Sequence, residues 1–363
     1  MEKTICTIIA KNYISFARTL CDSFLEHNAG GKCYVLIVDD FDGYIDAANE
    51  NFEIVRIEEL NIPRLKEFCF KYNIVELSTA AKPYFLKYLL DRKSVDKILY
   101  LDPDILVLND MQAVYDRLDS WDILLTPHTD KDFPEDGLHP NDTAVMKHGV
   151  FNLGFLGLKM SKTGDEFLLW WQGKLYNKCV IEYDKGYFVD QKFVDYAVTL
   201  FQNIGILYEP GYNVAYWNLH GRRVYFENIE WKCNDGPLYF YHFSSYKPEK
   251  PHVLSKHLTR FSFDTMPEVK RLFQLYTDKV NANGYKETHK LPYTYGCFAN
   301  GDVILDLMRK WYRKNIAILH IDNPFDLRQY DAKSVAVIAA IKCYKKLTKT
   351  ILGVKASLSS VGK

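Results

Sequence analysis

Residues 97–108 read KILYLDPDILVL, with two carboxylates between two apolar runs. The apolar runs predict a buried strand. Pro103 cannot donate a hydrogen bond to a sheet, so the strand is expected to end or bend there. Asp102 and Asp104 would then lie at a strand end, where paired carboxylates suit a hard divalent cation such as Mg²⁺ or Mn²⁺. An ordinary polar strand end is the alternative that this motif alone leaves open.

The segments around this motif alternate between strand-like and helix-like patterns. Apolar runs rich in β-branched residues predict strands at 5–10, 33–38 and 53–57, and helical spacing predicts helices at 15–26 and 79–90. This alternation is typical of an α/β fold with a mostly parallel central sheet and helices on both faces. In such sheets ligands bind beyond the carboxyl ends of the strands, which is where Asp102 and Asp104 fall.

Beyond residue 110 the chain is predicted to contain a long loop and then mixed elements. A loop is expected at 129–147, because this stretch is rich in Asp, Pro, His and Lys. Strands are predicted at 150–158, 207–217, 223–226 and 238–243, and helices at 165–175 and 190–201. From residue 267 onward the chain is predicted to be mainly helical.

The composition is that of a globular protein without an excess of either charge. Of its 363 residues, 48% are hydrophobic and 25% charged, and 46 Lys and Arg balance 46 Asp and Glu. This balance argues against a nucleic-acid partner. Eight cysteines without a Cys-x-x-Cys pair predict neither a zinc site nor a disulfide framework. With no signal-peptide pattern and no run of ~20 apolar residues, a cytoplasmic location is expected.

The end of the chain has a basic amphipathic pattern. Five lysines alternate with two leucines, an isoleucine and a valine between residues 342 and 355. A helix of this kind can lie on an anionic membrane surface. An ordinary terminal helix packed on its own domain is the alternative, and both remain open at this point.

Two residues far from the aspartates suit the same cation site. His242 lies near the end of the strand predicted at 238–243, and Lys247 follows it in the sequence. A neutral imidazole can be a third ligand for Mn²⁺, and an ammonium group can neutralise phosphate oxygens. A histidine that is only hydrogen-bonded at a strand end is the alternative.

Six segments of the first 250 residues resemble, in the same order, motifs of glycosyltransferase family 8. They are Ile8-Ile9-Ala10-Lys11-Asn12-Tyr13, Thr79-Ala80-Ala81-Lys82, the run from Ile98 to Asp104, Phe151-Asn152-Leu153-Gly154, Asp190-Gln191, and His242 with Lys247-Pro248. The family's Asn-Tyr turn holds the base and ribose of a nucleotide sugar, and its Asp-x-Asp motif holds the metal. Its Phe-Asn-x-Gly strand lines the donor sugar pocket, and its Asp-Gln pair lies beneath the transferring carbon.

The resemblance implies a GT-A fold and a role for each matching residue. The donor would be bound by Ala10, Tyr13, Lys82, Asp102, Asn152, Gly154 and Lys247. Asp102, Asp104 and His242 would hold Mn²⁺ or Mg²⁺, and Asp190 and Gln191 would be the catalytic residues. The implied reaction is transfer of a hexose, with retention, from a nucleotide sugar (a uridine diphosphate hexose) to a glycan or glycolipid acceptor. Asp190 as the base of an inverting reaction is the alternative.

Three departures mark the chain as divergent from that family. Lys82 takes the place of an Arg in the family, so the paired hydrogen bonds that a guanidinium group can donate to the donor are lost. Lys192 stands where a further Asp is usual. The last motif lacks its glycine and its tryptophan. Sugar, linkage and acceptor therefore cannot be carried over from the resemblance.

Structural roles remain open for several of the matching residues. Asp190 is also a suitable N-cap for the helix predicted at 190–201. Tyr13 is also a suitable core aromatic, and Asn152 and Gly154 also fit a bulged strand. The stretch 211–220, rich in aromatic and amide side chains, suits either sugar binding or a buried strand.

Two other functions are alternatives. Asp102-Pro103-Asp104 also resembles the nucleophile motif of haloacid-dehalogenase-like phosphatases, and residues 301–306 resemble their late acidic motif. That fold, however, places its nucleophile on the first strand. The second alternative is a degenerate, non-catalytic member that binds glycan, and the presence of both Asp102 and Asp104 argues against it.

The predicted organisation is a GT-A catalytic domain at 1–255, a helical extension at 256–330 and a basic tail at 331–363. Within the catalytic domain, 1–110 is expected to bind the nucleotide sugar and 111–255 to form the acceptor side. The extension is expected to carry an acceptor contact or a homodimer contact. If the tail lies on a membrane rather than packing on its own domain, it would bring the enzyme to the inner face of the cell membrane, as a peripheral protein in surface-glycan synthesis.

Overall fold

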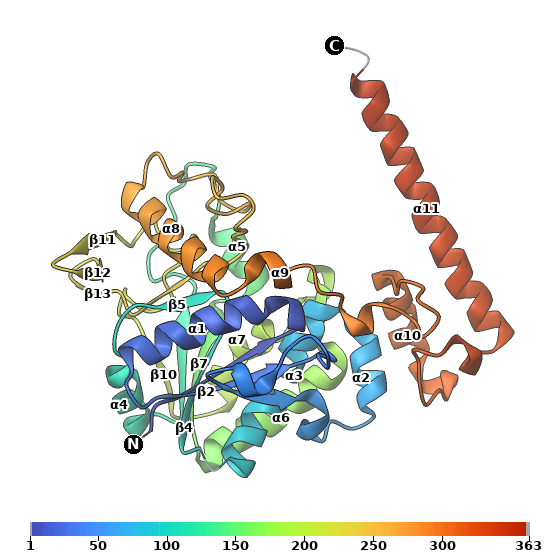
Figure 1. Cartoon of the computed structure of the whole chain (residues 1–363), viewed down its shortest axis with the longest axis horizontal. Coiled ribbons are helices and arrows are strands. Elements are labelled where there is room, and N and C mark those ends of the chain that lie inside the picture. The colour runs from blue at the N-terminus through green and yellow to red at the C-terminus, as the bar shows by residue number, and fades with distance from the viewer. Residues whose placement is uncertain (1, 94, 361–363) are drawn as a thin grey trace. The chain divides into compact units, whose positions relative to one another are not determined.

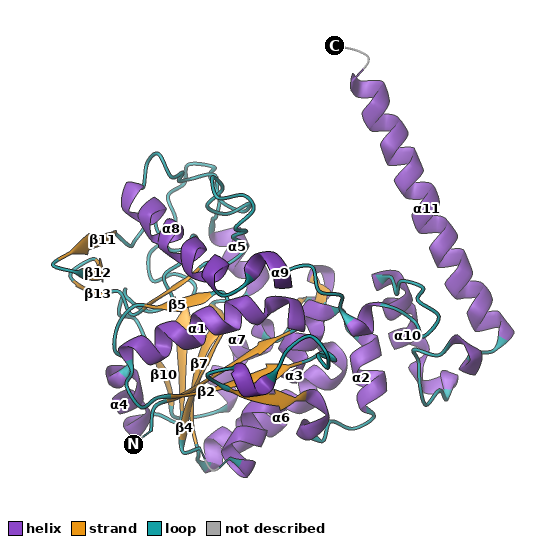
Figure 2. Cartoon of the chain, viewed as in Figure 1, coloured by secondary structure: helices purple, strands orange, loops and turns teal. Residues whose placement is uncertain are grey.

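The centre of the structure is a seven-stranded, mainly parallel sheet (Figure 2). The computed structural model describes residues 2–93 and 95–360. The sheet is built from β1 (Thr4–Ile9), β2 (Lys32–Ile37), β3 (Glu53–Arg56), β4 (Lys97–Leu101), β6 (Ile123–Pro127), β7 (Phe151–Lys159) and β10 (Ile204–Ile206). Their order is β10-β6-β7-β4-β1-β2-β3, and only β7 runs antiparallel to its neighbours.

Helices cover both faces of this sheet. On one face α1 (Ile14–His27) and α4 (Gln112–Ser120) share a buried core with Ile5, Ile9 and Leu99. Successive side chains of a strand point to opposite faces, so Tyr100 points to the other face. There Lys82 of α3 (Ile74–Arg92) lies over the ring of Tyr100, with 4.2 Å from Nζ to the centroid. The predicted α/β class, with a mostly parallel sheet between helices, is confirmed.

A second, smaller core joins the later elements to α1. The short strands β5 (Ile105–Val107) and β14 (Phe240–His242) form an antiparallel pair. The helix α8 (Pro267–Ala282) lies alongside α1 (Figure 1). The rings of Phe243 and Tyr276 stack between these elements with centroids 3.8 Å apart. The other α-helices and strands between residues 142 and 288 are α5 (Asp142–His148), α6 (Lys162–Lys178), β8 (Ile181–Glu182), β9 (Tyr187–Phe188), α7 (Gln191–Leu200), β11 (Val224–Glu227), β12 (Glu230–Cys233), β13 (Gly236–Pro237) and α9 (Tyr285–Thr288).

The chain divides into two compact units. Unit 1 contains Met1–Leu60 and Ser78–Pro292, and unit 2 contains Asn61–Leu77 and Tyr293–Lys363. Unit 2 is built from α2 (Leu65–Lys71), the first turn of α3, α10 (Asp306–Leu319) and α11 (Ala332–Ser360). This division differs from the predicted boundaries at 255 and 330. Residues 256–292 belong to unit 1 because α8 buries its apolar face in the core of that unit. The functional roles assigned to the predicted ranges stay predictions.

Unit 2 has a core of its own. Phe70 of α2 packs edge-on against Tyr312 of α10, with ring centroids 4.8 Å apart. The guanidinium group of Arg309 donates to the carbonyl oxygens of Phe70 and Tyr72, at 2.5 and 2.6 Å. A buried guanidinium that satisfies backbone carbonyls in this way ties α10 to the end of α2. No helix among the described residues is both long and apolar enough to cross a membrane.

Two of the predicted elements were wrong. The stretch predicted as a strand at 207–217 is irregular, and within it Asn213 has a left-handed backbone (φ 51°), which interrupts an extended strand. The polar loop expected at 129–147 ends in the helix α5. That helix begins after Asn141, whose side chain accepts a hydrogen bond from the amide of Ala144 at 3.3 Å.

Candidate functional site

The aspartates of the opening motif meet His242 at one point of unit 1. Each of Asp102, Asp104 and His242 offers one ligand atom, and these atoms lie within 4.8 Å of one another. His242 Nε2 is 3.1 Å from Asp104 Oδ1 and 3.8 Å from Asp102 Oδ2. The structure therefore brings together the three residues predicted to bind a cation.

The backbone explains why these residues meet. Asp102 follows β4, and Asp104 precedes β5 after the turn at Pro103. The strand β14 pairs with β5 so that His242 lies opposite Ile105, next to Asp104. The amide of Phe243 then donates to the carbonyl oxygen of Asp104 at 2.8 Å. The pairing of two short strands thus delivers His242 to the aspartates.

The spacing and chemistry of this group fit a divalent cation. With metal–ligand distances of about 2.1 Å, two ligands of one octahedral ion lie about 3 Å apart when adjacent and about 4.2 Å apart when opposite. The separations of 3.1 and 3.8 Å fall in that range. Two carboxylates and one imidazole form a donor set that suits Mn²⁺ or Mg²⁺. The carboxylates remain about a quarter to a third exposed, which leaves room for a ligand.

Neighbouring side chains orient the ligands. The hydroxyl of Tyr100 donates to Asp102 Oδ1 at 2.7 Å, and burial raises the pKa of Tyr100, which keeps it a donor. Burial lowers the pKa of His242, but the carboxylates of Asp104 and Asp102 raise it by more. The net pKa of His242 is therefore above its ordinary value when no cation lies between these groups.

Lys82 and Asp190 form a buried ion pair beside the aspartates. Lys82 Nζ is 2.6 Å from Asp190 Oδ2 and also donates to the carbonyl oxygen of Leu153 at 2.8 Å. Burial raises the pKa of Asp190, and the ammonium group of Lys82 opposes that shift. Asp190 does occupy the N-cap position of α7, but its side chain makes no capping hydrogen bond. Its carboxylate forms the ion pair with Lys82 instead.

Gln191, at the start of α7, and Asn152, in β7, both form side-chain hydrogen bonds with backbone groups. Gln191 Oε1 accepts from the amide of Leu153 at 3.0 Å, and its Nε2 donates to the carbonyl oxygen of His148 at 2.8 Å. Asn152 Oδ1 accepts from the amide of Gly154 at 3.1 Å. Gln191, predicted to be catalytic, and Asn152, predicted to bind the donor, are therefore both held by backbone groups.

Gly154 allows the close approach of His242. A Cβ atom at this position would lie 2.4 Å from His242 Cε1 and 2.7 Å from Asn152 Oδ1. Carbon atoms cannot approach to 2.4 Å, so any larger residue would displace the imidazole. The glycine of the Phe-Asn-x-Gly segment is thus needed by the geometry of the candidate metal centre.

The other predicted donor residues lie at different depths. Ala10 is buried, and its carbonyl oxygen accepts from the amide of Tyr13 at 2.9 Å. Tyr13 is 43% exposed and stacks on Phe16, so it is not a core aromatic. Partial burial and then the negative charges of Asp104 and Glu249 raise the pKa of Tyr13. Lys247 lies exposed in the loop after β14, and its donor contact stays a prediction.

Sequence reasoning missed two residues behind this site. Asn213 accepts a hydrogen bond from the ring of His242 (3.2 Å), and His128 contacts Asn152 (3.2 Å). Asn213 stood in the aromatic and amide-rich stretch 211–220, which the structure largely buries. The amide content of that stretch was the available signal, but its buried position could not be read from the pattern.

The phosphatase alternative expects its nucleophile on the first strand. Asp102 instead follows β4, which lies between β1 and the antiparallel strand β7. The structure therefore adds no support to that alternative.

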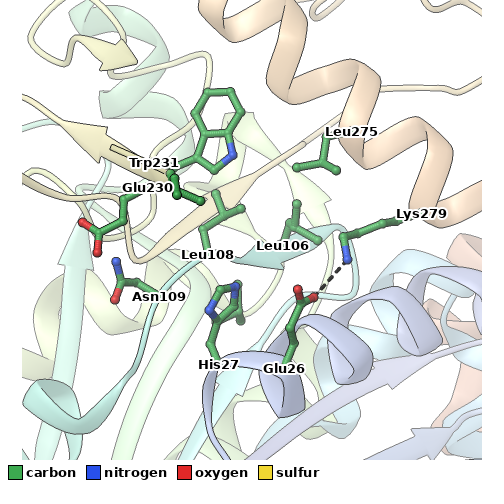
Figure 3. Close-up of a pocket in the computed structure, with 11 residues that line it drawn as sticks. Glu26, His27, Leu106, Leu108, Asn109, Glu230, Trp231, Leu275 and Lys279 are labelled. Carbon is green, nitrogen blue, oxygen red and sulfur yellow. Dashed lines mark hydrogen bonds and ion pairs between the residues drawn. The ribbon is translucent and has the colours of Figure 1, made fainter. Parts of the chain in front are cut away.

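A separate pocket of about 340 Å³ lies in unit 1 (Figure 3). It is lined by the end of α1, the residues after β5, the β11–β12 turn and α8. Figure 3 shows Glu26 and Lys279 joined by an ion pair of 3.0 Å, with Trp231 among the other residues that line the pocket. None of the predicted site residues lines this pocket.

Comparisons with known proteins find distant similarities. No protein-family model matches the chain. Two uncharacterized proteins of Bacillus subtilis (strain 168) are similar to it. YfnF is 25% identical over 256 residues (68% of this chain and 82% of YfnF), and YfnD is 24% identical over 249 residues (66% and 76%).

Two solved glycosyltransferase structures also align with the chain. The galactosyltransferase LgtC, in complex with donor and acceptor sugar analogues, has a TM-score of 0.47 at 15% identity, covering 80% of this chain and 97% of LgtC. The glycosyltransferase GlyE of Streptococcus pneumoniae TIGR4 has a TM-score of 0.44 at 20% identity, covering 82% of this chain and 67% of GlyE. TM-scores of this size carry no functional conclusion.

Proposed function

We propose that this protein is a divergent, family-8-like glycosyltransferase of the GT-A type that uses a divalent cation. The observation that carries the proposal is the meeting of Asp102, Asp104 and His242, with ligand atoms within 4.8 Å of one another. The Phe-Asn-x-Gly segment supports the proposal, since Gly154 lies so close to His242 that a Cβ atom there would be 2.4 Å from His242 Cε1. The donor is a nucleotide sugar, and a uridine diphosphate hexose is our first candidate.

In this proposal the three ligands hold Mn²⁺ or Mg²⁺ against the donor diphosphate. The cation, when bound, supplies Lewis-acid stabilisation of the leaving nucleoside diphosphate. Tyr100 keeps Asp102 oriented through its hydroxyl hydrogen bond. Tyr13 offers an exposed ring face for the nucleotide base. Asn152 and Gly154 provide polar contact and close backbone approach for the donor sugar.

The ion pair of Lys82 and Asp190 bears on the stereochemistry. A carboxylate that is buried and 2.6 Å from an ammonium group is a poor base for an acceptor hydroxyl. We therefore favour retention, with the acceptor attacking on the face from which the diphosphate leaves, over an inverting reaction with Asp190 as base. Asp190 and Gln191 would then stabilise positive charge at the reacting carbon from below.

Turnover of a panel of nucleotide sugars tests this function. The full-length protein is incubated with Mn²⁺ and each donor, and released nucleoside diphosphate is measured. We expect hydrolysis of at least one hexose donor, and nuclear magnetic resonance of the released or transferred sugar then reports the anomer. Binding of a donor without any turnover of it, with or without glycan acceptors, would favour the non-catalytic alternative.

We also propose that the basic tail makes a peripheral membrane contact and brings the enzyme to a glycolipid acceptor. In the part of α11 with described side chains, Tyr344 and Leu347 are 60% and 62% exposed beside Lys345. Exposed apolar and basic side chains on one helix suit anionic lipid headgroups. Co-sedimentation with vesicles of phosphatidylglycerol should exceed that with phosphatidylcholine. A variant that ends at Cys343 should lose the difference, and equal binding by both proteins would refute the contact.

A further inference from the structure

A row of hydrogen-bonded side chains lies behind His242. His242 Nδ1 is 3.2 Å from Asn213 Oδ1, Asn213 Nδ2 is 3.0 Å from Asn152 Oδ1, and Asn152 Nδ2 is 3.2 Å from His128 Nε2. All four side chains are buried, and Asn213 is 0% exposed. Each link needs one donor and one acceptor, so the direction of one hydrogen bond decides the directions of the others.

Backbone groups fix the direction of this row at two places. The amide of Gly154 points at Asn152 at 3.1 Å, and because an amide N–H can only donate, the facing atom must be Asn152 Oδ1. At the far end, the carbonyl oxygen of Gly149 lies 2.7 Å from His128 Nδ1 and can only accept. His128 Nε2 is then an acceptor, which matches Asn152 Nδ2. Both ends therefore require the same orientation of Asn152.

The orientation of Asn213 follows from that of Asn152. Because Asn152 presents an oxygen, Asn213 must present its Nδ2, which also donates to Thr126 Oγ1 at 2.8 Å. The oxygen of the Asn213 amide is left facing the imidazole of His242. An oxygen acceptor there keeps the proton of a neutral imidazole on Nδ1. The lone pair of Nε2 then points toward Asp104 and Asp102.

We propose that Asn213 is a positioning residue for the metal centre, holding His242 in the Nδ1–H tautomer that presents Nε2 to the cation. This inference rests on the proposed metal-dependent function of the same site. A metal binds imidazole through its unprotonated nitrogen, and the partner of the other nitrogen sets the tautomer. Asn213 itself sits at φ 51°, a conformation that asparagine tolerates better than most residues. With this backbone conformation, the side-chain amide of Asn213 lies beside Nδ1 of His242.

Mn²⁺ binding by calorimetry, without nucleotide, tests the role of Asn213 in the full-length protein. Asn213→Ala should weaken Mn²⁺ affinity by roughly 10- to 100-fold, the usual effect of losing an orienting partner. Asn213→Asp keeps an oxygen acceptor for His242 Nδ1 but sets its second oxygen against Asn152 Oδ1, so it should restore only part of the affinity. Thr126→Val is the matched control, because it removes a neighbour of the same amide without touching its oxygen, and it should bind Mn²⁺ like the wild type.

The tautomer can also be measured directly in the wild type. With ¹⁵N-labelled histidine at alkaline pH, the resonances that disappear in His242→Gln belong to His242. They should show a protonated Nδ1 and an unprotonated Nε2. A protonated Nε2 would overturn the proposal.

The outcomes separate this inference from the proposed function. If His242→Ala binds Mn²⁺ as tightly as the wild type, the metal centre is wrong, and the role of Asn213 falls with it. If His242→Ala loses Mn²⁺ while Asn213→Ala keeps wild-type affinity, only the role of Asn213 is overturned. Equal losses in Asn213→Ala, Asn213→Asp and Thr126→Val would also overturn it, because they indicate packing alone.

Discussion

Lys82 Nζ and Asp190 Oδ2 lie 2.6 Å apart, and the two side chains are only 2% and 3% exposed. The pair joins α3 to the start of α7. Each residue is the counter-charge of the other, so neither can be assigned a role at the candidate site by itself. Lys82 would place a fixed positive charge near the donor only because Asp190 keeps that charge tolerable in a buried place.

Replacing Lys82 by Met should destabilise the protein by about 3–5 kcal/mol, because Asp190 would stay buried without its counter-charge. The double variant Lys82→Met/Asp190→Asn should recover part of this loss, since the amide carries no charge. Urea unfolding of the wild type and both variants measures the two effects.

Lys162→Met is the control for that comparison. Lys162 and Glu166 are 3.8 Å apart, and their side chains are 89% and 57% exposed, so the loss of their ion pair should scarcely change the free energy of unfolding. An effect of Lys82→Met no larger than that of Lys162→Met would show that the buried pair does not form.

Gly154→Ala should weaken Mn²⁺ binding by at least roughly tenfold, because the new Cβ would lie 2.4 Å from His242 Cε1 and displace a proposed ligand. Calorimetric titration with Mn²⁺ measures this change. Gly173→Ala is the matched control, since a Cβ there meets nothing within 4 Å and the residue lies inside α6. It should leave Mn²⁺ binding unchanged and stabilise the helix by about 0.5–1 kcal/mol. Wild-type affinity in Gly154→Ala would contradict the close contact.

His128 should make the protein less stable as the pH falls. Burial lowers the pKa of His128 to about 3, against about 6.5 in an unfolded chain. Between these two values the unfolded state takes up a proton that the folded state does not. The stabilisation is therefore complete above pH ~6.5 and is lost as the pH falls toward 3, with a slope of up to about 1.4 kcal/mol per pH unit.

The variant His128→Gln isolates that contribution. It should lower the free energy of unfolding at neutral pH, because the hydrogen bond to the carbonyl oxygen of Gly149 is changed. Its stability should nevertheless fall less steeply than that of the wild type between pH ~6.5 and ~4. His252→Gln, at an exposed position, should keep the wild-type slope. Parallel curves for the wild type and His128→Gln would contradict a neutral, buried His128.

The sequence predicted those parts of the fold that depend on local patterns. Strand 97–101 and the aspartates after it follow from an apolar run that ends at Pro103. The alternation of strands and helices predicted the parallel sheet, because this connection has few alternatives. The resemblance to a family then added Lys82, Asn152, Gly154 and Asp190. In the structure Lys82 pairs with Asp190, Asn152 contacts Gly154, and the carbonyl oxygen of Gly154 accepts from the amide of Asp102.

The rest depends on contacts between distant parts of the chain. His242 reaches Asp104 through the register of β14 on β5, which no local pattern specifies. The partnership of Lys82 with Asp190 was missed for the same reason. Asn213 lies in a stretch that resembles a strand in composition, and only its backbone angle and the surrounding amides reveal its role. Tertiary packing, rather than propensity, decides such positions.

The central claim is that Asp102, Asp104 and His242 hold a cation for the transfer of a sugar from a nucleotide donor. The most direct test compares donor hydrolysis by the wild type and Asp104→Ala at saturating Mn²⁺, using the donor that the wild type turns over. We predict hydrolysis by the wild type that requires Mn²⁺ and falls by at least roughly 100-fold in Asp104→Ala, as expected when a ligand of a catalytic metal is removed. Hydrolysis that proceeds equally without Mn²⁺, or that is unchanged in Asp104→Ala, would contradict the account.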